Sequence, residues 1–87
     1  MKPYIVTLSF QVPVVAKSEI DAIMVALEYA NDEYNSYGGG NDLGRLAKVR
    51  AVKRKSDLPK GFRGCLPWGQ PDGREEEIEW WIESGKA

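Results

Sequence analysis

The sequence predicts a small α+β domain: a single small sheet, arranged β-α-β and followed by a C-terminal β-hairpin, with one helix packed on one face. Three features predict this class. An alternating apolar segment opens the chain, a segment with helical spacing follows, and a second alternating segment comes after a turn signal near the C-terminus. The chain has 87 residues, so we expect one domain, residues 1–87, with an irregular loop at about 55–74.

The first expected element is a strand over residues 6–14. Every second position is apolar, as in a strand with one buried face: Val6, Leu8, Phe10, Val12 and Val14. Pro13 has no N–H to donate to a neighbouring strand. We therefore expect this strand to lie at an edge of the sheet or to be kinked near its end.

A helix is predicted over about residues 19–36. Ser18 occupies the N-cap position, and Glu19 and Asp21 place negative charge in the first turn, where the helix dipole favours it. The following apolar residues have helical spacing: Ile20, Ile23, Met24, Leu27, Ala30 and Tyr34. Gly38–Gly40 should end the helix because consecutive glycines lose too much backbone entropy there, and residues 38–44 should form a loop.

A second strand is predicted over residues 46–54, and its two faces differ in charge. Basic side chains share one face with two apolar residues: Leu46, Lys48, Arg50, Val52 and Arg54. Apolar residues occupy the other face: Ala47, Val49 and Ala51.

The C-terminal third is expected to form a hairpin around Pro71-Asp72-Gly73, a strong turn signal. A short strand is expected near residues 65–68, and a second over residues 75–83, where apolar and acidic positions alternate. A helix is the alternative for the latter segment. The turn and the aromatic and β-branched residues favour the strand.

The helical alternative rests on Ile78, Trp81 and Ile82, which have i, i+3, i+4 spacing. In a strand, by contrast, Trp80 and Trp81 would face opposite sides of the sheet. Trp81 is then the expected outward residue, either covered by the loop or exposed as a contact residue for a partner.

The residue inventory argues against catalysis. The chain has no histidine, so it lacks the usual general base and metal ligand, and we expect no enzyme, cofactor or metal site. Cys65 is the only cysteine, which excludes an intrachain disulfide and fits a cytoplasmic location. Arg63 could lower the pKa of the Cys65 thiol, but without a histidine base we expect no nucleophilic role.

The N-terminus has no signal-peptide core, and no run approaches the roughly 20 apolar residues that span a bilayer, so we expect no membrane partner.

Two charged runs are candidate binding surfaces. The basic run could follow nucleic-acid phosphates, bind a protein, or complement the acidic C-terminal segment, and contains Arg45, Lys48, Arg50, Lys53, Arg54, Lys55, Lys60 and Arg63. The acidic run could be a solvated strand or bind a basic partner, and contains Glu75, Glu76, Glu77, Glu79 and Glu83. The formal net charge of −1 gives no overall attraction to nucleic acid.

Residues 10–18, Phe-Gln-Val-Pro-Val-Val-Ala-Lys-Ser, resemble a family of small phage inhibitors of bacterial RNA polymerase, represented by the inhibitor of bacteriophage T7. That family shows Phe-Glu-Val-Pro-Ile-x-Ala-x-Thr, an acidic-Ala pair and a further Ala on its helix, similar to Asp21-Ala22 and Ala26 in this chain. It then has a strand with Arg-Val-Arg, which Lys48-Val49-Arg50 resembles. The resemblance covers residues 10–26 and 48–50, under a quarter of the chain.

The resemblance implies a strand-helix-strand-strand fold and binding to the jaw of the polymerase largest subunit, which blocks a productive promoter complex. It gives Lys48 and Arg50 the places of two contact arginines, and Gln11 the place of a contact glutamate. Gln11 departs from the family because it lacks that negative charge. The loop after the helix is also longer in this chain, and residues 55–87 have no counterpart.

We therefore expect a non-catalytic, phage-type host-takeover protein that binds and inhibits a host protein machine in the host cytoplasm, with bacterial RNA polymerase as the leading candidate. The candidate partner-binding residues are Gln11, Lys48, Arg50, Lys53, Arg54 and Trp81. The alternative is a small nucleic-acid-binding module that uses the basic strand and loop at residues 45–63. A self-assembling protein is a third hypothesis, although we expect a monomer or weak dimer.

Overall fold

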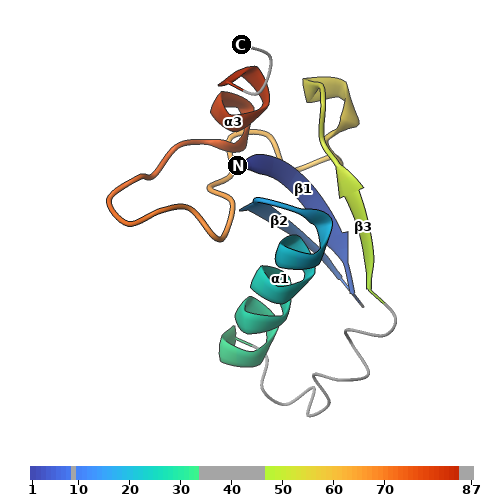
Figure 1. The fold of residues 1–87 in the computed structure, drawn as a ribbon. Helices are drawn as coiled ribbons and strands as arrows, with labels where there is room; N and C mark the ends of the chain where they lie inside the picture. The colour runs from blue at the N-terminus through green and yellow to red at the C-terminus, as the bar shows by residue number, and fades with distance from the viewer. Residues whose placement is uncertain (9, 34–46, 85–87) are drawn as a thin grey trace.

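The computed structural model describes residues 1–8, 10–33 and 47–84, the side chains of residues 30–33 excepted (Figure 1). Its described strands form a three-stranded antiparallel sheet in the order β2-β1-β3. The elements along the chain are β1 (Lys2–Thr7), β2 (Gln11–Ala16), α1 (Glu19–Glu33), β3 (Lys48–Ala51), a short 3-10 helix η2 (Lys55–Asp57) and α3 (Ile78–Ser84). The predicted α+β class is confirmed.

The predicted strand over residues 6–14 is wrong, because this segment is a hairpin of β1 and β2. At the turn, the Leu8 N–H donates to the Phe10 carbonyl over 2.8 Å. The antiparallel register pairs Val6 with Val12. Even-numbered residues therefore pair with even-numbered residues, and both strands place them on the same face. The alternation continues across the turn, so the period alone does not reveal that the chain reverses.

Pro13 lies in an edge strand, as predicted, because β2 ends the strand order. Its carbonyl accepts a hydrogen bond from the Trp68 N–H (3.0 Å), and the Val15 N–H donates to the Trp68 carbonyl (2.8 Å). A parallel bridge between Val14 and Trp68 thus takes the place of the short strand expected at residues 65–68. This loop covers the outer edge of β2.

The start of α1 at Glu19 is as predicted, and the Ser18 Oγ accepts a hydrogen bond from the Asp21 N–H over 3.2 Å. The predicted end near residue 36, Tyr34 and the loop at residues 38–44 lie outside the described residues.

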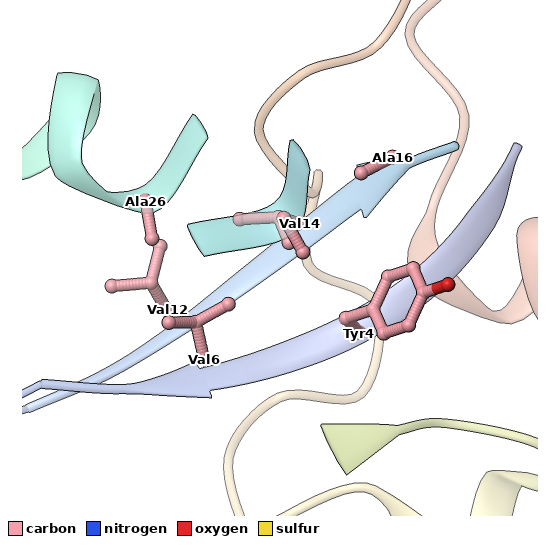
Figure 2. Close-up of a cluster of buried hydrophobic side chains, with 7 residues drawn as sticks. Tyr4, Val6, Val12, Val14, Ala16 and Ala26 are labelled. Carbon is pink, nitrogen blue, oxygen red and sulfur yellow. The ribbon is translucent and has the colours of Figure 1, made fainter. Parts of the chain in front are cut away.

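Small residues of α1 pack on the sheet. Ala22 and Ala26 are fully buried there, whereas Ile20 and Met24 are 71% and 57% exposed. Figure 2 shows the sheet side of this core, formed by Tyr4, Val6, Val12, Val14 and Ala16. Alanines allow a helix to approach a sheet closely, and Ile20 and Met24 of the predicted apolar stripe do not pack on the sheet.

The second predicted strand is present but shorter than residues 46–54, since β3 spans Lys48–Ala51. Its alternation is as predicted, because Lys48 and Arg50 are exposed while Val49 and Ala51 are half-buried. Beyond β3, the Val52 N–H donates to the Pro3 carbonyl over 3.0 Å. Pro3 has no N–H to donate in return, so the ladder weakens there.

The predicted C-terminal hairpin is wrong, because its second strand is the helix α3. The turn itself is confirmed: the Arg74 N–H donates to the Pro71 carbonyl over 3.1 Å, and Gly73 adopts a φ of 80°. After the turn the chain does not return along the sheet but enters α3 at Ile78.

The helix α3 packs on the sheet face opposite α1. Ile78 and Ile82 form a second buried cluster with Ile5 and Val52. Ile5 lies between Tyr4 and Val6 in β1, so its side chain points away from α1. The prediction of a helix on one face only is therefore corrected: the described part of the sheet has α1 on one face and α3 over one end of the other (Figure 1).

Candidate protein-binding site

The end of the sheet that α3 leaves uncovered forms a shallow concavity of 310 Å³ on the face opposite α1. The register creates it, because Thr7 pairs with Gln11 on one side and with Lys48 on the other, and Ile5 pairs with Arg50. We call this site the basic concavity, and its lining residues are Ile5, Thr7, Gln11, Lys48, Val49 and Arg50. Three of the predicted contact residues, Gln11, Lys48 and Arg50, thus lie together.

Arg50 is held in place without losing its charge. Its Nη2 donates to the Asp57 carbonyl over 2.9 Å. The Asp57 carboxylate is engaged elsewhere, because its Oδ2 accepts from the N–H groups of Lys53 (3.3 Å) and Arg54 (3.2 Å). In the described part of the chain, no carboxylate forms an ion pair with Lys48 or Arg50. The concavity therefore presents two cationic side chains.

The remaining predicted basic contacts lie elsewhere. Lys53 and Arg54 are exposed beyond the end of β3 and do not line the basic concavity. Lys55 forms an ion pair with Glu83 of α3 (2.8 Å), and this hydrogen bond raises the pKa of the lysine. Both side chains are more than half exposed, so the pair stabilises the fold little. Arg45 lies outside the described residues.

The expectation that Trp81 is the outward member of the tryptophan pair is wrong. Its side chain is only 7% exposed on α3, and its Nε1 donates to the Gln70 Oε1 over 2.9 Å. Trp80 is the exposed neighbour at 39%, with the Arg74 guanidinium 4.9 Å from the centre of its ring. The helical spacing of Ile78, Trp81 and Ile82 was the signal in the sequence that could have identified Trp81 as the buried member of the pair.

The acidic run does not form a metal site among the described residues. Glu79 instead accepts hydrogen bonds at both carboxylate oxygens from the Gly64 N–H, at 2.9 and 3.0 Å, and so holds the loop before α3. Nor is any helix in the described ranges long and apolar enough to cross a bilayer.

Cys65 is half-buried, and this burial, with a smaller contribution from Glu79, raises the pKa of its thiol. The expectation that Arg63 lowers this pKa is wrong. We predict that an aromatic disulfide reagent reacts with Cys65 more slowly at pH 8 than with the same thiol in the urea-unfolded chain, because less thiolate is present. The difference should shrink as the pH rises above the raised pKa. Equal rates in the folded and unfolded chains at pH 8 would contradict the prediction.

Comparison with protein-family models, with curated proteins and with solved structures gives no match. The choice of a partner therefore rests on the arrangement of the chain's own residues and on the short resemblance at residues 10–26 and 48–50.

Proposed function

We propose that this protein is a non-catalytic, phage-type inhibitor that binds a host protein machine through the basic concavity, with bacterial RNA polymerase as the leading candidate. The observation that supports it is the meeting of Gln11 from β2 with Lys48 and Arg50 from β3 in one concavity. These are the positions that the resemblance assigns to partner contact, and they come from two separate segments of the chain.

The chemistry of the concavity favours an acidic protein surface. Arg50 offers a planar fork of donors to carboxylates, and Lys48 adds a second positive charge. Thr7 and Gln11 add neutral hydrogen-bonding groups beside them. Charges of one sign on such a site speed association with an oppositely charged partner and exclude partners of the same charge.

A protein partner fits the site better than single-stranded nucleic acid. Proteins that bind single strands combine basic grooves with aromatic side chains on which bases stack. No aromatic residue of the described ranges lines the basic concavity. Trp68 packs instead against Tyr29 of α1, with ring centroids 4.4 Å apart, and Trp80 lies on α3 beside Arg74. Among the described residues, the aromatic and basic groups do not form one continuous path.

The double substitution Lys48→Glu/Arg50→Glu is expected to weaken binding to purified bacterial RNA polymerase by at least about 100-fold, because each lost charge-assisted hydrogen bond costs roughly 1.5–3 kcal/mol. Binding is measured by biolayer interferometry, and inhibition by transcription from a promoter template. The control is Lys60→Glu/Arg63→Glu, which makes the same change in net charge at exposed residues outside the concavity.

The outcomes separate the hypotheses. If the unsubstituted protein neither binds polymerase nor slows transcription, the polymerase assignment is wrong. Equal losses in both double variants would show that overall charge, and not the concavity, governs binding. A gel-shift of DNA or RNA that weakens steeply with salt and disappears in Lys48→Glu/Arg50→Glu would favour the nucleic-acid alternative.

A further inference from the structure

The two edges of the sheet differ in how far the described residues cover them. The outer edge of β2 carries Pro13 and is covered by the backbone of Trp68. Among the described residues the outer edge of β3 has no such cover: β3 ends the strand order, and Figure 1 shows no other described strand beyond it. Exposed sheet edges are the places where extended segments of other proteins add as strands.

The register shows which backbone groups of β3 are available. The backbone N–H of Val52 donates to the Pro3 carbonyl of β1. Backbone groups at every second position of a strand point the same way, so the N–H and carbonyl of Arg50 also point toward β1. The N–H and carbonyl groups of Val49 and Ala51 then point outward from the sheet. Within the described residues, no hydrogen bond is made to these outward groups.

The same edge continues into a groove at the end of the sheet. This groove has a volume of 520 Å³ and begins where β3 ends. We call it the terminal groove, and it is lined by Lys2, Pro3, Tyr4, Glu19, Ala51, Val52, Lys53, Trp81 and Ile82. Trp81 and Ile82 of α3 give it an apolar wall, and Lys53 extends the positive charge of β3 to its rim.

We propose that this edge binds an extended acidic segment of a partner protein, which adds to the sheet as a fourth strand beside β3 and places an apolar side chain in the terminal groove. The proposal rests on the proposed function, because the same partner would occupy the basic concavity. Beyond the basic concavity, the partner would then also contact the backbone of β3 through an extended acidic segment.

Charge selects the segment. A strand added about 4.8 Å from β3 would place alternate side chains beside Lys48 and Arg50. Opposite charges in such cross-strand positions stabilise a sheet and like charges destabilise it, so these side chains should be acidic. The intervening side chains would lie beside Val49 and Ala51, which are half-buried toward α1. These should be apolar.

The same charges argue against a second copy of this chain as the occupant. Two β3 strands paired edge to edge would bring the Lys48 and Arg50 side chains of one copy beside those of the other. No carboxylate of the described residues forms an ion pair with either side chain to offset this repulsion. The acidic segment is therefore the better match for the edge.

The test uses the whole protein and a labelled ten-residue peptide of alternating glutamate and valine. In the free protein, the amide hydrogens of Val49 and Ala51 should exchange rapidly, whereas that of Val52 should be slower. Saturating peptide should slow exchange at Val49 and Ala51 by at least tenfold, as followed by NMR. Unchanged exchange at both residues, or no binding of the peptide at millimolar concentration, overturns the proposal.

Two methylated peptides test the backbone contacts directly. Only every second N–H of an added strand faces β3, so methylation of one alternate set of peptide nitrogens should weaken binding at least tenfold. Methylation of the other set should leave binding within about threefold of the parent. Equal affinities for both methylated peptides would contradict strand addition.

Ala51→Pro tests the same contact from the protein side. It removes an outward N–H and leaves the Val52 hydrogen bond to Pro3, as Pro13 occupies an edge position in β2. We expect at least tenfold weaker peptide binding, whereas the control Ala51→Val, which keeps the N–H, should bind normally. If Ala51→Pro does not fold, the methylated peptides still test strand addition with the unsubstituted protein.

The peptide assay contains no polymerase, so the two proposals can fail separately. Peptide binding without polymerase binding refutes the polymerase assignment alone. Full polymerase binding by folded Ala51→Pro refutes strand addition alone. A dimer in sedimentation experiments that Ala51→Pro abolishes would show that a second copy of the chain pairs with the β3 edge. That result would overturn the proposal that an acidic segment binds there.

Discussion

Trp81→Ala is expected to lower the free energy of unfolding by about 3–5 kcal/mol, the usual cost of truncating a large buried aromatic side chain. Trp81 is 7% exposed, and its ring meets that of Trp80 edge-on at 5.0 Å between centroids. Its Nε1 also donates to the Gln70 Oε1. Small domains are stable by only about 5–15 kcal/mol, so this one substitution removes a large share of the total.

The loss should extend beyond the cavity, because Gln70 organises the loop before α3. Its Oε1 also accepts from the Glu76 N–H (2.9 Å), and its Nε2 donates to the Pro67 carbonyl (3.2 Å). Removal of the indole N–H leaves this amide less firmly held. Urea unfolding followed by far-UV circular dichroism measures the effect.

Trp80→Ala is the matched control for Trp81→Ala. The neighbouring indole is 39% exposed and stacks with Arg74, so its removal should cost about 1 kcal/mol or less. A larger loss for Trp80→Ala than for Trp81→Ala would mean that α3 packs through a different face. Such a result would contradict the register of α3, in which Trp81 is the buried member of the pair.

The second large effect is expected for Gly69→Ala, at about 2–4 kcal/mol of unfolding free energy. Gly69 has a φ of 87°, and a Cβ at this position would lie 2.6 Å from the Val15 carbonyl oxygen and 3.0 Å from the Val25 Cγ1. The loop would have to move away from β2. It would then lose the two backbone hydrogen bonds between Trp68 and the edge strand.

Gly73→Ala separates the two causes of this effect. Gly73 has a similar φ of 80°, but a Cβ there would meet nothing within 4 Å. Gly73→Ala should lower the free energy of unfolding only by the cost of the left-handed backbone conformation, about 1 kcal/mol. Thermal unfolding of both variants makes the comparison. Equal destabilisation would show that the close approach of Gly69 to β2 contributes nothing.

The N-terminal half shows what local patterns can predict. Ser18 identified the start of α1, because a cap is a contact between residues close in sequence. The hairpin before it was missed, because Val6 and Val12 keep the same parity on either side of the turn. The packing face of α1 was also partly missed, because it depends on how closely the alanines approach the sheet.

The C-terminal segment shows the opposite difficulty. Glutamates at alternate positions gave residues 75–83 the pattern of a strand, while Ile78, Trp81 and Ile82 carried a helical pattern at the same time. Packing against the sheet favours the helix over the strand. Ile5 and Val52 form an apolar site on the face opposite α1, and the helix buries Ile78 and Ile82 against it.

The site was predictable in its residues but not in its shape. The exposed faces of Lys48 and Arg50 follow from the two-residue period of β3. Their meeting with Gln11 depends on the pairing of both β2 and β3 with β1, which no single segment encodes. The terminal groove depends on α3 and could not be foreseen from a predicted hairpin.

The position of the tryptophans has a practical consequence for experiments on folding. All three, Trp68, Trp80 and Trp81, belong to the C-terminal segment that packs on the hairpin, and none lies in the sheet. Intrinsic tryptophan emission therefore reports the docking of that segment, whereas circular dichroism also reports the strands and α1. Coincident transitions by the two signals would indicate one cooperative unit, and an earlier shift in emission would reveal release of the segment from a sheet that is still folded.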